Sequence, residues 1–166
     1  KDELSSVRLV AAEAIGAIGA GALDSVGAMV QALDDDDGSV RIAIAFSLQA
    51  LAEHDGERVA RILVETIDDP DQSDRIRRIA SGLISETHRF SNVDFEDFAP
   101  EFGRALRDRD GMIRRLAIRV VESESGLARE IVPQLIESLA DVDVAAKLVD
   151  ILSRISGSAM PELILA

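Results

Sequence analysis

Apolar residues recur along this chain at the spacing of one helical face, in blocks separated by short acidic turns. Four blocks each begin at an apolar–basic pair and continue with apolar residues three or four positions apart: Val7, Val10, Ala11, Ala14, Ile15 and Ile18; Val40, Ala43, Ile44, Leu48 and Leu51; Ile76, Ile79, Ala80, Leu83 and Ile84; Ile113, Leu116, Ala117, Val120 and Val121. A second apolar series follows each block. The pattern predicts paired amphipathic helices along the whole chain and an all-α fold.

At five places an aspartate is followed, six positions later, by a basic residue that begins a first helix. The pairs are Asp2/Arg8, Asp35/Arg41, Asp71/Arg77, Asp108/Arg114 and Asp141/Lys147. The basic residue recurs at intervals of 33, 36, 37 and 33 residues. A near-constant period of this length indicates a stacked helical repeat. We expect five two-helix repeats, at about residues 1–33, 34–67, 68–106, 107–139 and 140–166.

The aspartates in the acidic turns between repeats have predictable hydrogen-bonding roles. Asp37, Asp110 and Asp143 fall where a helix N-cap belongs, so we expect them to accept hydrogen bonds from main-chain N–H groups. The earlier aspartate of each pair is expected to bind an arginine of its own or an adjacent repeat, forming a ladder of charge-assisted hydrogen bonds. Lys147 lacks the guanidinium fork and should make the weakest rung. A row of calcium or magnesium sites is the alternative, disfavoured because the spacing of a calcium-binding loop is absent.

The residues 7–19 and 131–139 resemble the first and second helices of HEAT repeats, in particular the short type of phycobilin lyases. The shared pattern is an apolar–Arg pair with Ala and Leu in the first helix, and Pro-x-Leu-x-x-x-Leu in the second. Pro100 and Pro133 each lie six residues before the last apolar residue, in the first helical turn. The resemblance implies an α–α superhelix, a HEAT-like solenoid, over residues 1–166. Met160-Pro161 repeats the proline register, so we expect a fifth repeat cut inside its second helix and a chain that is part of a longer solenoid.

Composition narrows the class of protein further. Hydrophobic residues make up 47% of the 166 residues, aromatic residues only 3%, and cysteine is absent, which excludes disulfides and thiolate sites. The longest weakly polar run, residues 9–23, contains Glu13 and is shorter than the about 20 apolar residues that span a bilayer. No signal-peptide pattern opens the sequence. We therefore expect a cytoplasmic protein with no membrane partner.

The chain is strongly acidic. The net charge is −13, with sixteen arginines, two lysines, eighteen aspartates and thirteen glutamates. This Asp-rich, Lys-poor profile resembles proteins of salt-loving archaea; an acidic scaffold from a mesophile is the alternative. Either way, such a surface repels phosphate backbones, so we expect no nucleic-acid partner.

No catalytic, cofactor-binding or metal-binding constellation is found. His54 and His88 are isolated, whereas HEAT-type hydroxylases use several facing His–Glu pairs, and a solvated or capping role is the interpretation. Gly16, Gly19 and Gly21 are interpreted as a helix stop and turn rather than a phosphate loop. We therefore expect a non-catalytic adaptor without cofactors; a HEAT-like enzyme or enzyme subunit is the alternative.

The candidate binding surface is the polar side of the second helices, which is acidic with interspersed arginines. A basic or mixed-charge protein segment is the expected partner, and a merely solvated face is the alternative. In and just after the irregular stretch 87–98, Phe90, Phe95, Phe98 and Phe102 are expected to pack inward and close a wider gap between the helices. A binding edge is the alternative, and Phe90 is the ring expected to be the most exposed. The candidate protein-binding residues are Glu65, Phe90, Glu101, Arg104, Gln134 and Glu137.

Overall fold

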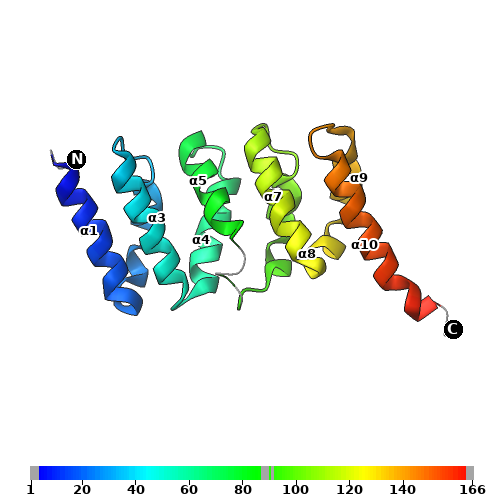
Figure 1. Cartoon of the computed structure of the whole chain (residues 1–166), viewed down its shortest axis with the longest axis horizontal. Coiled ribbons are helices and arrows are strands. Elements are labelled where there is room, and N and C mark those ends of the chain that lie inside the picture. Colours follow the sequence, from blue (N-terminus) through cyan, green and yellow to red (C-terminus); the bar gives the residue numbers. More distant parts are fainter. Residues whose placement is uncertain (1–3, 87–89, 91, 164–166) are drawn as a thin grey trace. The chain divides into compact units, whose positions relative to one another are not determined.

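The computed structural model describes residues 4–86, 90 and 92–163 of the chain (Figure 1). Within these residues every regular element is helical and none is a strand, as the apolar periodicity predicted. The chain divides into two compact units, residues 1–93 and 94–166. The third predicted repeat, residues 68–106, therefore contributes its first helix to unit 1 and its second helix to unit 2.

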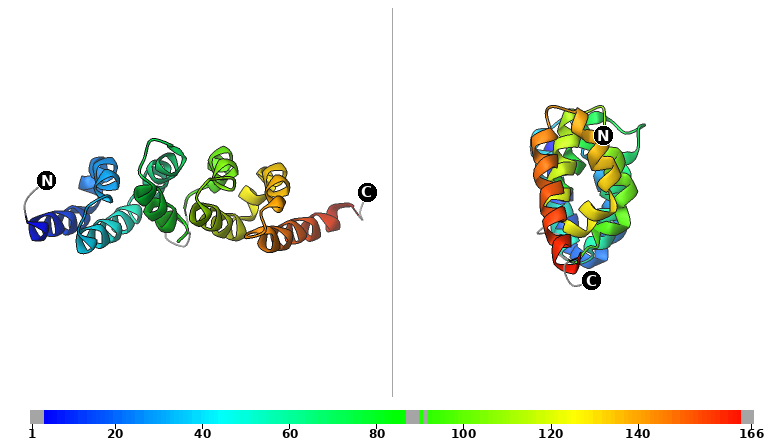
Figure 2. Two further views of the ribbon diagram at one scale, coloured as in Figure 1. Left: turned by 90° about the horizontal axis from the view of Figure 1, so that it is seen from above. Right: turned by 90° about the vertical axis from the view of Figure 1, so that its right-hand side faces the viewer.

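Unit 1 contains two layers of helices (Figure 2). The first helices α1, α3 and α5 lie side by side, and the second helices α2 and α4 lie behind them. The bounds are α1 Ser5–Ile18, the 3₁₀ helix η1 Gly19–Ser25, α2 Val26–Ala32, α3 Gly38–Ala52, α4 Gly56–Asp68 and α5 Asp74–Ile84. The core between the layers is aliphatic, and Leu33, Leu48, Leu51 and Leu63 are almost wholly buried.

Close contact between α1 and α3 depends on small residues. A Cβ atom on Gly16 would lie 2.6 Å from the Oγ atom of Ser47, and that hydroxyl donates a 2.8 Å hydrogen bond to the main-chain oxygen of Ala12. Gly16 therefore lies inside α1 as a packing residue, and the prediction that it belongs to the helix stop is wrong.

Gly19 ends α1, as predicted. Its φ of 63° lies in the left-handed region, and a Cβ atom there would meet the His54 imidazole at 2.6 Å. The stretch Ser5–Ala32 is, by length and composition, apolar enough to cross a membrane, with a mean hydropathy of 1.5. The chain turns back at Gly19, however, and the 14 residues of α1 span only about 21 Å. Neither arm alone matches the roughly 30 Å hydrocarbon layer of a bilayer.

Unit 2 has the same two-layer arrangement. Its elements are η3 Phe95–Phe98, α6 Ala99–Ala105, α7 Gly111–Ser123, α8 Ser125–Glu130, α9 Val132–Glu137, η4 Ser138–Ala140 and α10 Ala145–Leu163. Pro100 and Pro133 occupy the first turns of α6 and α9, as predicted, where a missing N–H costs little. The second helix of the fourth predicted repeat is broken into α8 and α9 at Ile131, whose backbone is not helical.

The last helix departs from the predicted repeat. α10 runs without a break to Leu163, so the expectation that a second helix restarts near Met160 is wrong. The hydroxyls of Ser153 and Ser156 donate to the carbonyls of Val149 and Leu152, four residues earlier. These bonds let serine stay inside a helix.

The phenylalanines are buried rather than displayed. In unit 2 the ring of Phe95 packs against those of Phe98 and Phe102, with centroids 6.4 and 6.0 Å away. In unit 1 Phe90 is only 3% exposed. The predicted inward packing of these rings therefore agrees with the structure, and the expectation that Phe90 is the most exposed of them is wrong.

Candidate functional site

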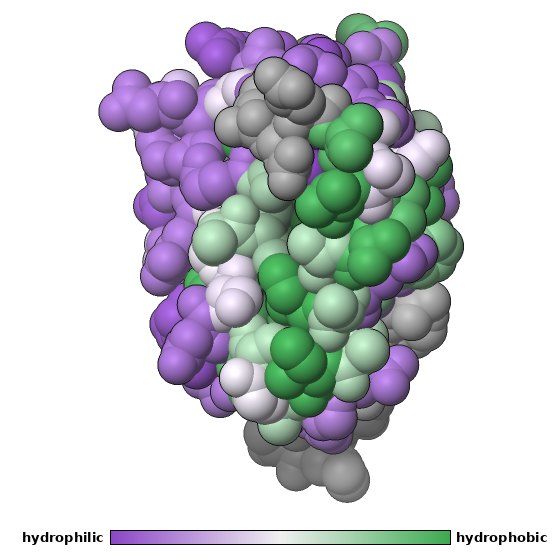
Figure 3. Space-filling view, turned by 90° about the vertical axis from the view of Figure 1, so that its left-hand side faces the viewer, coloured by the Kyte–Doolittle hydropathy of each residue, from purple (hydrophilic) through white to green (hydrophobic). Residues whose placement is uncertain are grey.

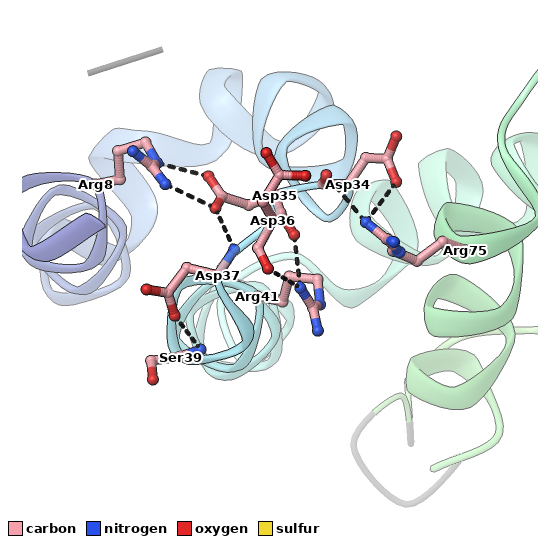
Figure 4. Close-up of polar contacts among 8 residues, drawn as sticks. All are labelled: Arg8, Asp34, Asp35, Asp36, Asp37, Ser39, Arg41 and Arg75. Carbon is pink, nitrogen blue, oxygen red and sulfur yellow. Dashed lines mark hydrogen bonds and ion pairs between the residues drawn. The ribbon is translucent and has the colours of Figure 1, made fainter. Parts of the chain in front are cut away.

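The turn before α3 contains the first rung of the predicted ladder (Figure 4). The Arg8 guanidinium of α1 grips the Asp35 carboxylate with two hydrogen bonds, from Nε at 2.7 Å and from Nη2 at 2.9 Å. The Asp35 side chain is only 8% exposed, and it also accepts the Asp37 main-chain N–H at 2.9 Å. The aspartate is therefore bound by the arginine of the preceding repeat, which was one of the two predicted possibilities.

Arg41, the basic member of the same pair, does not contact the Asp35 carboxylate but its main chain. Arg41 Nη1 donates to the carbonyl oxygens of Asp35 and Asp36, at 2.7 and 3.0 Å. Asp37 caps α3 by accepting the Ser39 N–H at 2.8 Å. That hydrogen bond, followed by one from the Ser5 hydroxyl, lowers the pKa of Asp37. Arg41 thus stabilises the main chain of its own turn, while Arg8 of the preceding repeat neutralises the Asp35 carboxylate.

Unit 2 repeats this geometry between α7 and α10. Arg114 Nε donates to Asp141 Oδ2 at 2.6 Å, and Arg114 Nη1 donates to the carbonyl of Asp108 at 2.9 Å. Asp110 caps α7 through the Met112 N–H. Asp143 does not cap α10 as predicted, because this helix begins two residues later, at Ala145; instead its N–H donates to Asp141.

The third turn has a different register from the predicted one. The carboxylate that accepts the N–H two residues on, as Asp35 does, belongs to Asp69, and Asp71 is the donor. Ser73 caps α5, and Arg77 Nε donates to the Ile67 carbonyl at 2.8 Å. Two extra residues around Pro70 lengthen this turn, so the aspartate equivalent to Asp35 lies eight residues before Arg77 and not six. The predicted Asp71/Arg77 pair therefore names the wrong aspartate, because Asp69 is the equivalent residue.

The two ends of the ladder differ from the middle. Asp2 lies outside the described residues. Lys147 does not reach an aspartate: its Nζ contacts both carboxylate oxygens of Glu122, at 2.9 and 3.3 Å. The Lys147 side chain is 62% exposed. This pair is a surface contact between α10 and α7, so the expected Asp141/Lys147 rung is replaced by a different one.

In unit 1 the polar side of the second helices forms what we call the second-helix face. Arg58 of α4 binds Asp24 of η1 at 2.7 Å, and Arg61 binds Glu57 one turn away at 3.1 Å. Glu65 is exposed on the same helix. Residues 19–32 and 56–68 contain four carboxylates and two arginines, so the face remains acidic after its arginines are paired.

In unit 2 the second-helix face has the same character. Arg104 binds Glu101 at 2.8 Å, and Arg107 binds Glu137 at 2.6 Å. Gln134 is half-buried and packs over Gly103, where a Cβ atom would lie 3.1 Å from its Cγ. Four of the five candidates on second helices thus lie at the surface and are charged, whereas Gln134 has a packing role as well.

Several exposed apolar side chains were not expected from the sequence. Val7, Val10 and Ile18 of α1 are 46, 60 and 63% exposed, although their spacing predicted a buried stripe (Figure 3). On α3, Ile42 and Phe46 are 58 and 65% exposed. In α1 only Ala12 is buried, because α3 covers one side of the helix alone. Phe46, rather than Phe90, is the exposed ring.

Glu124, between α7 and α8, has a pKa perturbed in the opposite direction to that of Asp37. Partial burial raises the pKa of Glu124, and the negative charge of Asp94 raises it further.

No group of three or more potential metal ligands occurs within the part of the chain that the structure describes. His54 packs over Gly19 at the end of α1, and His88 lies outside the described residues.

Comparison with protein-family models matches residues 1–84 to the model described as HEAT repeats. The match covers half of the chain. The chain belongs to the HEAT-repeat family. No curated protein matches it. The HEAT match includes the Val7–Gly19 segment on which the resemblance was based, and the helix pairs of unit 2 continue the same architecture beyond residue 84.

Proposed function

We propose that this HEAT-repeat protein is a non-catalytic scaffold whose second-helix faces bind a basic or mixed-charge segment of a partner protein. The main support is the charge arrangement: the arginines Arg58, Arg61 and Arg104 are each paired with a carboxylate of the same unit. Carboxylates remain in excess around them, as Glu65 illustrates. An approaching basic segment therefore meets acidic groups without competition from unpaired arginines.

The alternation of paired and unpaired charges also favours a segment of mixed charge. Exposed ion pairs such as Arg104–Glu101 contribute only about 0–1 kcal/mol, so a partner can exchange with them at small cost. Complementary charge raises the association rate and selects among partners more than it raises affinity. Such a face suits an adaptor with exchanging partners.

The test is a binding titration with a fluorescent peptide of lysine, serine and leucine, followed by anisotropy at about 0.15 M salt, where the screening length is about 8 Å. Glu65→Lys in unit 1 and Glu137→Lys in unit 2 are expected to weaken binding severalfold. Glu13→Lys makes the same charge change on the exposed side of α1 and is the matched control. Equal losses in all three variants would show attraction to net charge alone and would remove the second-helix face as the site.

We also propose that the protein works in a salt-rich cytoplasm. The support is its Asp-rich, Lys-poor composition and net charge of −13, because dense carboxylates keep a protein soluble and apart from others.

A further inference from the structure

Two arginines of α7, Arg115 and Arg119, differ from every other arginine that the structure describes. Each of the remaining thirteen has a hydrogen bond, an ion pair or another polar partner. Arg115 and Arg119 have none within the described part of the chain, although the protein has 31 carboxylates. Both side chains are exposed.

Their spacing makes this arrangement unfavourable by itself. Residues four apart lie on the same face of a helix one turn from each other, and like charges there repel by a few tenths of a kcal/mol. At the same register, α5 one repeat earlier has Arg78 and Gly82, and α3 two repeats earlier has Ile42 and Phe46. The doubled charge is therefore a local feature of α7 and not a property of the repeat.

The two arginines line a hollow between α7 and α10, which lie next to each other in unit 2 (Figure 1). The hollow has a volume of about 270 Å³, and its other walls are Ile118, Glu122, Asp143, Val144 and Lys147. Lys147 binds the Glu122 carboxylate at 2.9 Å, whereas, among the described residues, the two guanidinium groups and the Asp143 carboxylate keep their charges unpaired in the walls of the hollow. The buried Ile118 and Val144 form an apolar floor.

A second hollow of about 220 Å³ adjoins the first, because Glu122 lines both. Its floor is again apolar, with Val121, Ala128 and Ile151, and its rim carries Arg129 and Arg154. Together the two hollows are lined by five cations and two carboxylates. They give one strip of unit 2 a positive balance in a chain whose net charge is −13.

We infer that this strip is a docking groove for an acidic, amphipathic segment of a partner protein. The partner's carboxylates bind Arg115 and Arg119, whose forked guanidinium groups suit bidentate contacts. Its apolar side chains rest on the floor formed by Ile118, Val144 and Val121. The apolar floor, which continues through both adjoining hollows, favours a peptide over a free oxoanion. The groove is lined by α7, α8, α10 and the turn before α10. It contains none of the residues assigned above to the second-helix face, so it does not depend on the function proposed above.

The experiment measures binding of a fluorescent peptide of glutamate, leucine and serine to the full chain. At about 0.15 M salt the screening length is about 8 Å, so the peptide senses the groove rather than the distant acidic turns. The double variant Arg115→Glu/Arg119→Glu is expected to weaken binding at least about tenfold, or about 1.4 kcal/mol. Because neither arginine has a partner to lose, its melting temperature should stay at or above that of the parent.

The matched control is Arg75→Glu/Arg78→Glu on α5, which makes the same change of net charge at exposed arginines. Its affinity for the acidic peptide should remain within about twofold of the parent value. An equal loss in both double variants would refute the groove, since net charge would then explain binding. A peptide with serine in place of leucine that binds equally well, or complete displacement by inorganic phosphate, would make the site an oxoanion site and overturn the proposal. The same holds if ultracentrifugation shows that a second copy of the chain occupies the groove.

Discussion

Replacing Arg8 with alanine is the most direct test of the ladder. The change leaves the Asp35 carboxylate, 8% exposed, with the Asp37 N–H and without two guanidinium donors. Removing one partner of a buried ion pair costs about 3–5 kcal/mol. Arg8 itself is 23% exposed and water can partly replace it, so we expect a loss of about 2–3 kcal/mol in the free energy of unfolding of unit 1.

Arg58→Ala is the control within the same unit. The Arg58–Asp24 distance is also 2.7 Å, but Asp24 is 94% exposed, and exposed pairs contribute about 0–1 kcal/mol. The two pairs have the same shortest distance but differ in burial, and the Arg8 pair has two hydrogen bonds where the Arg58 pair has one. A double-mutant cycle with Arg8→Ala, Asp35→Asn and the double variant should give a coupling energy between the two side chains above about 1 kcal/mol.

The assay is urea unfolding followed by far-UV circular dichroism, because the chain has no tryptophan or tyrosine to report by fluorescence. With a urea dependence of about 2 kcal/mol per molar, Arg8→Ala should lower the midpoint by about 1 M, and Arg58→Ala by less than about 0.5 M. Amide hydrogen exchange resolves the effect by unit: α1 and α3 should lose protection while α7 and α10 keep theirs. Equal, small shifts for Arg8→Ala and Arg58→Ala would mean that the paired turns are only surface charges.

Four further outcomes are expected. Gly19→Ala should destabilise unit 1 by about 1–2 kcal/mol in urea unfolding, because φ is 63° and His54 approaches closely; a neutral result would mean that the turn relaxes freely. The folded state lowers the pKa of Asp37, so the stability it confers is present above its unfolded pKa and is lost as pH falls through the folded value; Asp37→Asn should flatten that part of the acid-unfolding curve. The folded state raises the pKa of Glu124, so its ionisation opposes folding as pH rises; Glu124→Gln should raise the melting temperature at pH 7 and leave it unchanged at pH 3. With a net charge of −13, the melting temperature should climb between 0.1 and 2 M potassium chloride, and a flat curve would count against adaptation to high salt.

The helical pairing could be predicted from the sequence because the first helices have a clear apolar period, and α3, α5 and α7 each have a capping residue of their own. The choice of ladder partner could not be predicted. Asp35 is six residues from Arg41 and 27 from Arg8, and only the stacking of α1 on α3 brings Arg8 to its carboxylate. The third turn was misassigned because a fixed spacing of six was counted back from Arg77, whereas the two residues around Pro70 lengthen the loop. The bonding of Asp69, two residues before Asp71, follows the other turns once the loop is aligned from Ile67.

The charge of the candidate binding surface could be predicted from the sequence, but the exposure of its aromatic rings could not. Glutamates and arginines on second helices are solvated whichever way the repeats pack, so Glu65, Glu101, Arg104 and Glu137 lie at the surface. Exposure of an aromatic ring depends on tertiary packing instead, and Phe90 is buried while Phe46 is not. The missing partners of Arg115 and Arg119 are likewise invisible in the sequence, because a pairing is known only after the neighbouring helices are placed.

The ladder has a direction, since in each unit the arginine comes from the earlier helix and the carboxylate from the later turn. The free-energy cost of breaking a rung therefore depends on whether the earlier helix or the later turn detaches first. When the earlier helix detaches, the later turn keeps a carboxylate that has lost its counter-charge, although it regains water. When the later turn detaches, the arginine still holds the carbonyl oxygens of its own turn, as Arg114 holds that of Asp108. Stepwise unzipping under load should thus differ in force and in hysteresis according to the end of the molecule that is pulled first.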